Sequence, residues 1–165
     1  MAEKLNAENI EKAVQHLEDI QTGKTPILSE LKGNIKEKEK KVFPLIPPSD
    51  PRLLMQIAPF LDESLEQFGF ADRKELSKVM YDNMVKYGGL GLSANQLGLP
   101  YRMFVMGGHP QVEDGKVRTV FNPLINDVSP ESINLKEGCL SFPFLFLSIK
   151  RPKWCSVRYT DENGE

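Results

Sequence analysis

Every aromatic side chain of this chain follows residue 42, and this asymmetry decides where a packed core can form. Nine Phe, four Tyr and one Trp occur among the 165 residues, and none of them precedes residue 43. Residues 1–42 instead carry 8 Lys and 8 acidic residues. Because large apolar side chains supply most of the burial in a core, we expect residues 1–42 to be a charged extension and residues 43–165 to form the main domain.

The overall composition is that of an ordinary folded protein. Apolar residues make up 40% and charged residues 27% of the chain, and the net charge is −2. The near-neutral balance predicts no direct nucleic-acid binding. No apolar run approaches the roughly 18 residues of a membrane span, and acidic residues follow Met1 where a secretion signal would be apolar. We therefore expect a cytoplasmic location, no membrane partner, and reduced thiols at Cys139 and Cys155.

Within residues 1–42, apolar side chains recur at helical spacing. They are Ile10, Ala13, Val14, Leu17 and Ile20. The pattern predicts one short amphipathic helix. Two interpretations of this extension stay open: a poorly ordered accessory segment, or a helix that docks on the main domain or on a partner.

The main domain is predicted to combine one principal helix with several short strands. Asp72 and Glu75 resemble a capping box that opens a helix over residues 72–87. Strand patterns follow over residues 103–106, 117–121, 142–149 and 154–160. This order indicates an α+β fold with short antiparallel or mixed sheets packed around helices. Residues 142–149 are apolar at nearly every position, so we expect them to be deeply covered.

A strong hairpin-turn signal, Asp161-Glu-Asn-Gly164, stands directly after the last predicted strand. Such a turn is expected to lead into a second strand, and none follows within the 165 residues. Strand 154–160 is therefore expected to lack the partner that would follow it in sequence.

A glycine-rich segment, Gly89-Leu-Gly-Leu-Ser-Ala-Asn-Gln96, is the first candidate motif. It weakly matches a dinucleotide-binding loop, but such a loop should follow a strand and open a helix. A functionless glycine turn is a second interpretation. In a third, the glycines admit the backbone of a ligand and Gln96 offers an amide donor to the same cleft.

The segment Glu137-Gly-Cys139-Leu-Ser-Phe-Pro143 is the second candidate motif. A cysteine before an apolar run is commonly a small buried apolar residue. A nucleophilic cysteine would need a base such as His109, and a metal site would need two or three further ligands. All three interpretations of Cys139 stay open from the residues alone.

Together, the two motifs resemble those of the peptide deformylase family. Gly89–Gln96 resembles the family's first motif, with Ser93 and Asn95 in place of its usual Ala and Pro. Glu137–Ser141 matches the second motif, Glu-Gly-Cys-Leu-Ser, without change. The proline-rich stretch near residues 47–52 also resembles the family's N-terminal segment, so that the resemblance covers residues 43–165.

The resemblance implies a metal-dependent amide hydrolase that removes the formyl group from formyl-methionyl peptides of newly made proteins. It implies Cys139 as a ligand of a divalent metal, usually iron(II), with zinc, nickel or cobalt as substitutes. Gln96 and the Leu140 backbone N–H would stabilise the oxyanion. The substrate-binding residues implied are Gly89, Leu90, Gly91, Glu137 and Gly138, with Glu137 orienting a ligand or an arginine. A partner near the ribosomal exit tunnel is a further expectation.

The third motif of the family, H-E-x-x-H on a central metal-binding helix, is missing from this sequence, and no His follows His109. We expect the chain to stop before that helix, and to be a deformylase fragment that is inactive alone. The alternatives are a catalytically inactive, deformylase-like peptide-binding module and unrelated cysteine chemistry. Without the helix, the chain is expected to expose a large apolar surface.

Overall fold

The computed structural model describes residues 41–108 and 115–165. The amphipathic helix expected in the extension, and His109, lie outside these residues. Among the residues described, no helix has both the length and the apolarity needed to cross a lipid bilayer.

The principal helix is α2 (Arg73–Lys86), which confirms the helix expected over residues 72–87. The Asp72 carboxylate accepts a hydrogen bond from the Glu75 N–H at 2.7 Å, so the N-cap is the predicted one. The Glu75 carboxylate accepts from the Ala71 N–H at 2.7 Å, one residue earlier than in a regular capping box. The helix ends where the Gly88 backbone enters the left-handed region at φ 69°.

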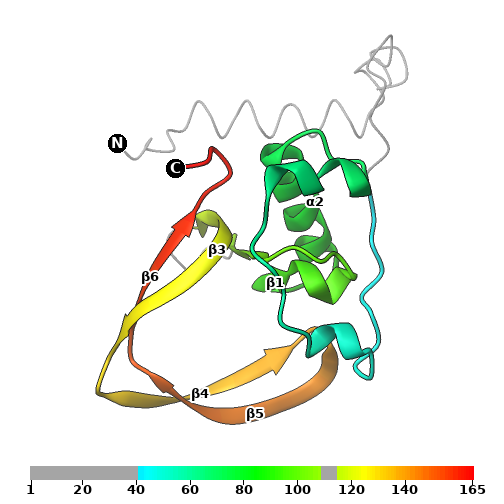
Figure 1. Cartoon of the computed structure of the whole chain (residues 1–165). Coiled ribbons are helices and arrows are strands. Elements are labelled where there is room, and N and C mark those ends of the chain that lie inside the picture. Colours follow the sequence, from blue (N-terminus) through cyan, green and yellow to red (C-terminus); the bar gives the residue numbers. More distant parts are fainter. Residues whose placement is uncertain (1–40, 109–114) are drawn as a thin grey trace, which may run out of the picture. The chain divides into compact units, whose positions relative to one another are not determined.

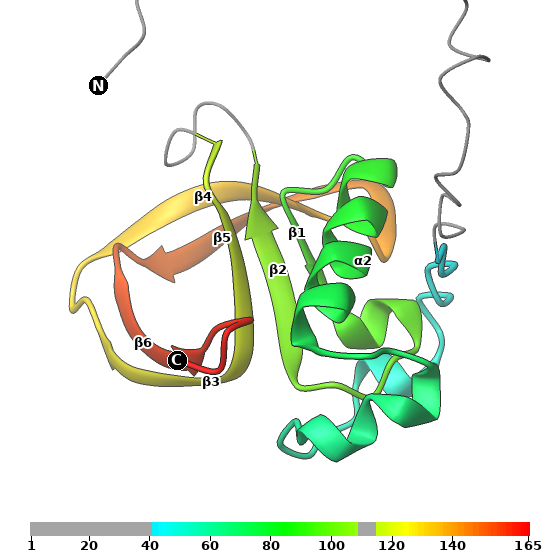
Figure 2. The ribbon, with the colours of Figure 1, turned by 90° about the horizontal axis from the view of Figure 1, so that it is seen from above.

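Six strands form two antiparallel sheets in the described part of the chain (Figures 1 and 2). The larger sheet has the order β1-β2-β3-β6, and the smaller one pairs β4 with β5. Their bounds are Gly91–Ser93 for β1, Met103–Gly107 for β2, Val117–Val128 for β3, Ser132–Cys139 for β4, Phe142–Pro152 for β5 and Cys155–Thr160 for β6. Among the described residues, α2 together with the short antiparallel sheets confirms the α+β class.

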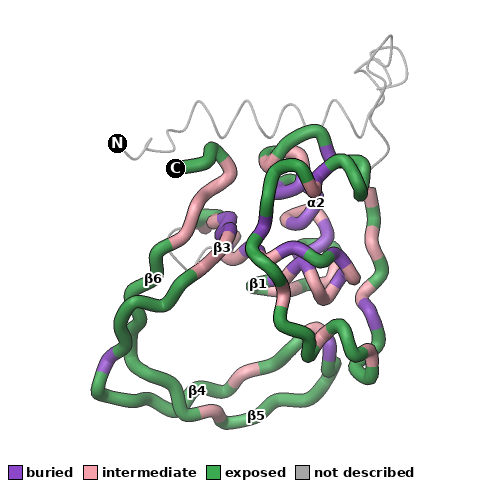
Figure 3. Tube along the Cα trace, in the orientation of Figure 1, coloured by how far each residue is buried: buried purple, intermediate pink, exposed green. Residues whose placement is uncertain are grey.

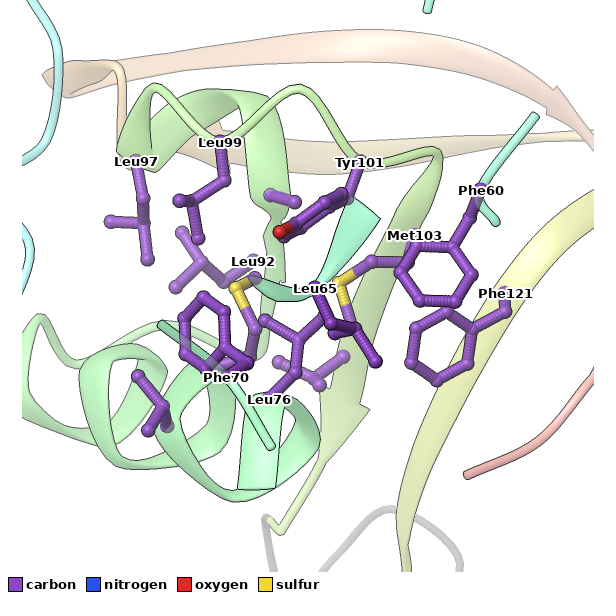
Figure 4. Packing of buried hydrophobic residues seen from close by; sticks show 14 of the residues in the cluster. Phe60, Leu65, Phe70, Leu76, Leu92, Leu97, Leu99, Tyr101, Met103 and Phe121 are labelled. Atoms are coloured by element: carbon purple, nitrogen blue, oxygen red, sulfur yellow. The ribbon is translucent and has the colours of Figure 1, made fainter. Parts of the chain in front are cut away.

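The core lies between α2 and the first strands, and aromatic rings pack against one another within it (Figure 4). The Phe60 ring lies 4.7 Å from that of Phe121 and 5.4 Å from that of Tyr101, measured between centroids. The Tyr101 hydroxyl donates to the Ser64 carbonyl at 2.9 Å, so this buried polar atom is paired.

The proline-rich leading segment is tied to both α2 and the glycine-rich segment. The buried Asn83 amide accepts from the Phe43 N–H at 3.0 Å and donates to the Lys41 carbonyl at 3.0 Å. Further along, the Ile46 N–H donates to the Gln96 carbonyl at 2.9 Å. This contact fixes the backbone of the short 3-10 helix Ala94–Leu97 that carries Gln96.

The interpretation of residues 142–149 as deeply covered is wrong for this chain. Phe144 is 97% exposed and Phe146 is 60% exposed, and exposed residues line nearly all of β4 and β5 in Figure 3. The apolar side chains of β5 form a surface that would be stabilised by packing against another element. No described element packs on it. The alternative expectation of a large exposed apolar surface is confirmed.

The last strand, β6, pairs with β3, a strand distant in sequence, with Val157 opposite Ile125. The turn predicted after it is present, because the Asp161 carboxylate accepts from the backbone N–H groups of Asn163 at 2.8 Å and Glu165 at 3.1 Å. These contacts also lower the pKa of Asp161.

Candidate active site

The two sequence motifs meet in space at the side chain of Gln96. This residue lies on the 3-10 helix that follows β1, and Cys139 lies at the end of β4. Gln96 Nε2 lies 3.0 Å from Ser141 Oγ, to which it donates, and 3.9 Å from Cys139 Sγ. Residues 43 or more positions apart in sequence thus form one polar cluster.

The local fold holds the Gln96 amide from its other end as well. Gln96 Oε1 accepts a hydrogen bond from the Ser93 backbone N–H at 2.9 Å. That bond belongs to a capping box at the start of the 3-10 helix. Because the carbonyl oxygen is held there, the NH₂ group is directed toward the Cys139 side of the cluster.

The glycine-rich segment has the wrong surroundings for a dinucleotide loop. It follows α2 rather than a strand, and it leads through β1 into a 3-10 helix of 4 residues. A phosphate-binding loop needs the N-terminus of a long helix. The dinucleotide interpretation is therefore wrong.

Gly89 packs directly against the second motif. A Cβ atom at this position would lie 2.7 Å from Leu140 Cδ1 and 3.1 Å from the Gly91 carbonyl oxygen. The first distance is shorter than any ordinary Cβ contact, so Leu140 would have to shift, and the second is tighter than most such contacts. The small residue here lets Leu140 approach, and Leu140 in turn packs against the core cluster.

The other predicted peptide-binding residues lie around this contact. Gly91 opens β1, which is one of the two edge strands of the larger sheet, and Leu90 beside it is 62% exposed. Gly138 lies opposite Phe146 in the β4–β5 ladder. A Cβ at Gly138 would lie 2.8 Å from Phe146 Cε1.

Glu137 forms an ion pair across the smaller sheet. Its two carboxylate oxygens accept from Arg151 Nε at 2.9 Å and from Arg151 Nη2 at 2.8 Å. The hydrogen bonds from Arg151 lower the pKa of Glu137, so the carboxylate is charged at neutral pH. Glu137 was predicted to orient a ligand or an arginine, without a particular arginine being identified; its partner is Arg151, which is paired with Ile133 in the ladder.

Cys139 is exposed, and both cysteines are free thiols. No group of three or more His, Cys, Asp or Glu side chains is placed to hold a metal ion within residues 41–108 and 115–165. His109, the base considered for a nucleophilic Cys139, is outside that part of the chain. The described residues therefore offer one soft ligand, where a zinc-type site takes three or four.

Sequence reasoning overlooked two residues of the cluster, Ser141 and Ser93. Ser141 is only 5% exposed, and its hydroxyl accepts from Gln96. A signal was present for Ser141, because a small hydroxyl residue directly after the Cys-Leu pair stands inside the second motif. Ser93 acts through its backbone N–H, and a signal for it was present as well, because Ser93-Ala-Asn-Gln96 has the Ser-x-x-Gln pattern of a capping box.

Comparison with known proteins agrees with this geometry. The polypeptide deformylase family model matches residues 50–165. A peptide deformylase of Wolbachia sp. subsp. Brugia malayi is 40% identical over 131 residues, which cover 70% of this chain and 71% of that protein. One of Thermotoga petrophila is 44% identical over 86 residues, and the match covers 52% of this chain and 49% of that protein.

The fold is also similar to solved structures. The crystal structure of peptide deformylase from Ehrlichia chaffeensis superposes with a TM-score of 0.65 at 34% identity, covering 76% of this chain and 72% of that one. The chain thus spans between about half and three quarters of the length of these relatives.

Proposed function

The chain belongs to the polypeptide deformylase family, and on that premise we propose that it serves the removal of the formyl group from the N-terminus of formyl-methionyl peptides. The observation that carries the proposal is the meeting of the two motifs, in which Gln96 Nε2 lies 3.9 Å from Cys139 Sγ. An amide donor and a thiol converge there on one exposed point. Amide hydrolysis requires such a donor wherever negative charge develops on the carbonyl oxygen.

In this proposal, Gln96 and the Leu140 backbone N–H stabilise the oxyanion of the formyl group. The Gln96 amide is held before substrate arrives, because its Oε1 already accepts from the Ser93 N–H at 2.9 Å. A preorganised donor needs no rearrangement as charge develops, and losing one typically raises the barrier by about 2.7–4 kcal/mol.

The peptide backbone would bind along Gly89, Leu90 and Gly91. These residues lead into β1, an edge strand of the larger sheet, and an extended peptide can pair with an edge strand through main-chain hydrogen bonds. The exposed Leu90 side chain offers apolar contact to the methionyl residue. Gly138 and Glu137 would form the facing wall, kept rigid by the Glu137–Arg151 ion pair.

The family implies a divalent metal, and we propose iron(II) with Cys139 as its ligand from this chain. The described residues do not fit the ion by themselves, because one thiolate is short of the three protein ligands of a catalytic site. Zinc, nickel and cobalt are the substitutes that the same thiolate would accept. We propose that the chain alone neither retains the metal stoichiometrically nor hydrolyses substrate.

Two further proposals concern where the chain works. Its substrates would be newly made chains, so we propose the cytoplasm as its location and the neighbourhood of the ribosomal exit tunnel as its working place. We propose no direct contact with nucleic acid, because a net charge of −2 gives the chain no overall attraction to phosphates.

A second candidate function is peptide binding without catalysis. The observation that favours it is the incomplete ligand set around Cys139. The two functions share the proposed peptide-binding residues and differ only in the metal. They are therefore separated by metal content and formate release, whereas peptide binding tests what they have in common.

The shared part is tested by titrating the ¹⁵N-labelled chain with a formyl-methionyl peptide. We expect amide shifts at Gly89, Leu90, Gly91 and Gln96, and weaker shifts with the same peptide bearing a free amine. Gly89→Ala should abolish the shifts, because its Cβ would displace Leu140. Leu61→Ala is the control, since the Leu61 side chain is 63% exposed and its φ of −126° suits any residue. Equal shifts with formylated and free peptide would refute the proposal.

A further inference from the structure

We propose that Ser141 is a positioning residue, whose hydroxyl fixes the Gln96 amide in the orientation that oxyanion binding requires. This inference rests on the proposed function and deepens it. Two different residues hold the two ends of the Gln96 amide. Ser93 holds the carbonyl oxygen of the amide at 2.9 Å, and Ser141 holds its nitrogen at 3.0 Å.

An amide group held at one end only can still move its other end. The Ser93 N–H is a backbone donor and persists whatever side chain stands at position 93. The contact between Ser141 Oγ and Gln96 Nε2 is therefore the one that a side-chain substitution can remove. With both contacts present, one N–H of Gln96 donates to Ser141, and the second is directed at Cys139 Sγ, a weak acceptor at 3.9 Å that a stronger acceptor can replace.

Burial favours the contact of Ser141 with Gln96 over a contact with water. Ser141 is 5% exposed, so water competes poorly for its hydroxyl, and a buried hydroxyl is strongly favoured to keep a protein partner. Its neighbours in the motif act differently: Cys139 is exposed, and the Leu140 side chain packs on the core. Of the three consecutive residues, Ser141 is thus the one whose side chain reaches Gln96 from within the structure.

The test follows the Gln96 side-chain NH₂ signals by ¹⁵N NMR in the full chain, with assignment by Gln96→Glu. We expect Ser141→Ala to speed solvent exchange of these protons about fivefold, the change that loss of one ordinary hydrogen bond produces. Ser141→Thr keeps the hydroxyl and should restore slow exchange. Ser77→Ala is the matched control, because Ser77 is similarly buried and its hydroxyl donates to the Arg73 carbonyl at 2.7 Å on α2.

Two outcomes overturn the inference. One is unchanged Gln96 exchange in a folded Ser141→Ala chain, and the other is faster exchange that Ser141→Thr does not reverse. If Ser141→Ala loses its dispersed amide spectrum, Ser141→Cys takes its place, because a thiol has similar volume but accepts hydrogen bonds weakly.

Formyl-peptide titration of the same samples separates this inference from the proposed function. Ser141-dependent exchange in a chain that binds no formyl peptide supports the positioning role and refutes the function. If the chain binds the formyl peptide but Ser141→Ala leaves Gln96 exchange unchanged, the function is supported and the positioning role is refuted.

Discussion

Replacing Phe144 by glycine should stabilise the chain, although it removes a large aromatic side chain. Phe144 has a φ of 66°, in the left-handed region, which costs an L-residue roughly 1–2 kcal/mol. Its side chain is 97% exposed, so its removal costs no burial. Glycine adopts this backbone freely but loses about 0.5–1 kcal/mol more conformational entropy on folding. The net expectation is a gain of about 0.5–1 kcal/mol over Phe144→Ala, which keeps the strain.

The assay is urea unfolding of the unmodified chain, Phe144→Gly and Phe144→Ala at micromolar concentration. Unfolding is followed by the fluorescence of Trp154, the single tryptophan. Leu145→Gly is the control, because Leu145 is next in sequence, is 49% exposed and has no positive φ. It should be destabilised by about 0.5–1 kcal/mol. If Phe144→Gly is no more stable than Phe144→Ala, the strain argument is wrong.

Three further predictions follow from the same structure. Arg151 lowers the pKa of Glu137 in the folded chain, so the ion pair stabilises the fold at pH values above the usual carboxyl range, and this stabilisation is lost as pH falls through the folded-state pKa. The melting temperature of Glu137→Gln should therefore fall less steeply than that of the unmodified chain between about pH 5 and pH 3. Parallel curves for the two chains would contradict this. Gly107→Ala should destabilise by at least about 2 kcal/mol in urea, because φ is 100° and a Cβ would lie 2.0 Å from the Lys116 carbonyl oxygen; a loss below 0.5 kcal/mol would contradict it. The exposed β4–β5 surface should bind a hydrophobic dye, and Phe146→Asp should reduce the fluorescence; a dye-silent, monomeric chain would show that this surface is covered.

Local signals predicted the elements that depend on neighbouring residues. The Asp72 cap and the apolar spacing of α2 were readable because helix geometry repeats within a few residues. The turn at Asp161 was readable for the same reason. The Ala71 partner of Glu75 differs by one residue from the expected cap, which reflects how the chain enters the helix rather than the helix itself.

Contacts between distant segments could not be read in this way. The pairing of β6 with β3 and the ion pair of Glu137 with Arg151 depend on how the strands register. The apolar run in β5 was misjudged because composition reports a tendency to be covered, and not whether a cover is present. The two motifs pointed to Gln96 and Cys139, but the role of Ser141 required knowing that all three meet.

We propose that this chain contributes a deformylase peptide-binding site in which Cys139 is the metal ligand supplied by the described residues. The most direct test measures metal content and formate release from the chain alone and from a chimaera that adds an H-E-x-x-H helix after Glu165. We predict neither for the chain alone, and both stoichiometric metal and formate release for the chimaera, lost together in Cys139→Ala. Formate release by the chain alone, or a folded chimaera whose metal content is indifferent to Cys139, would contradict the account.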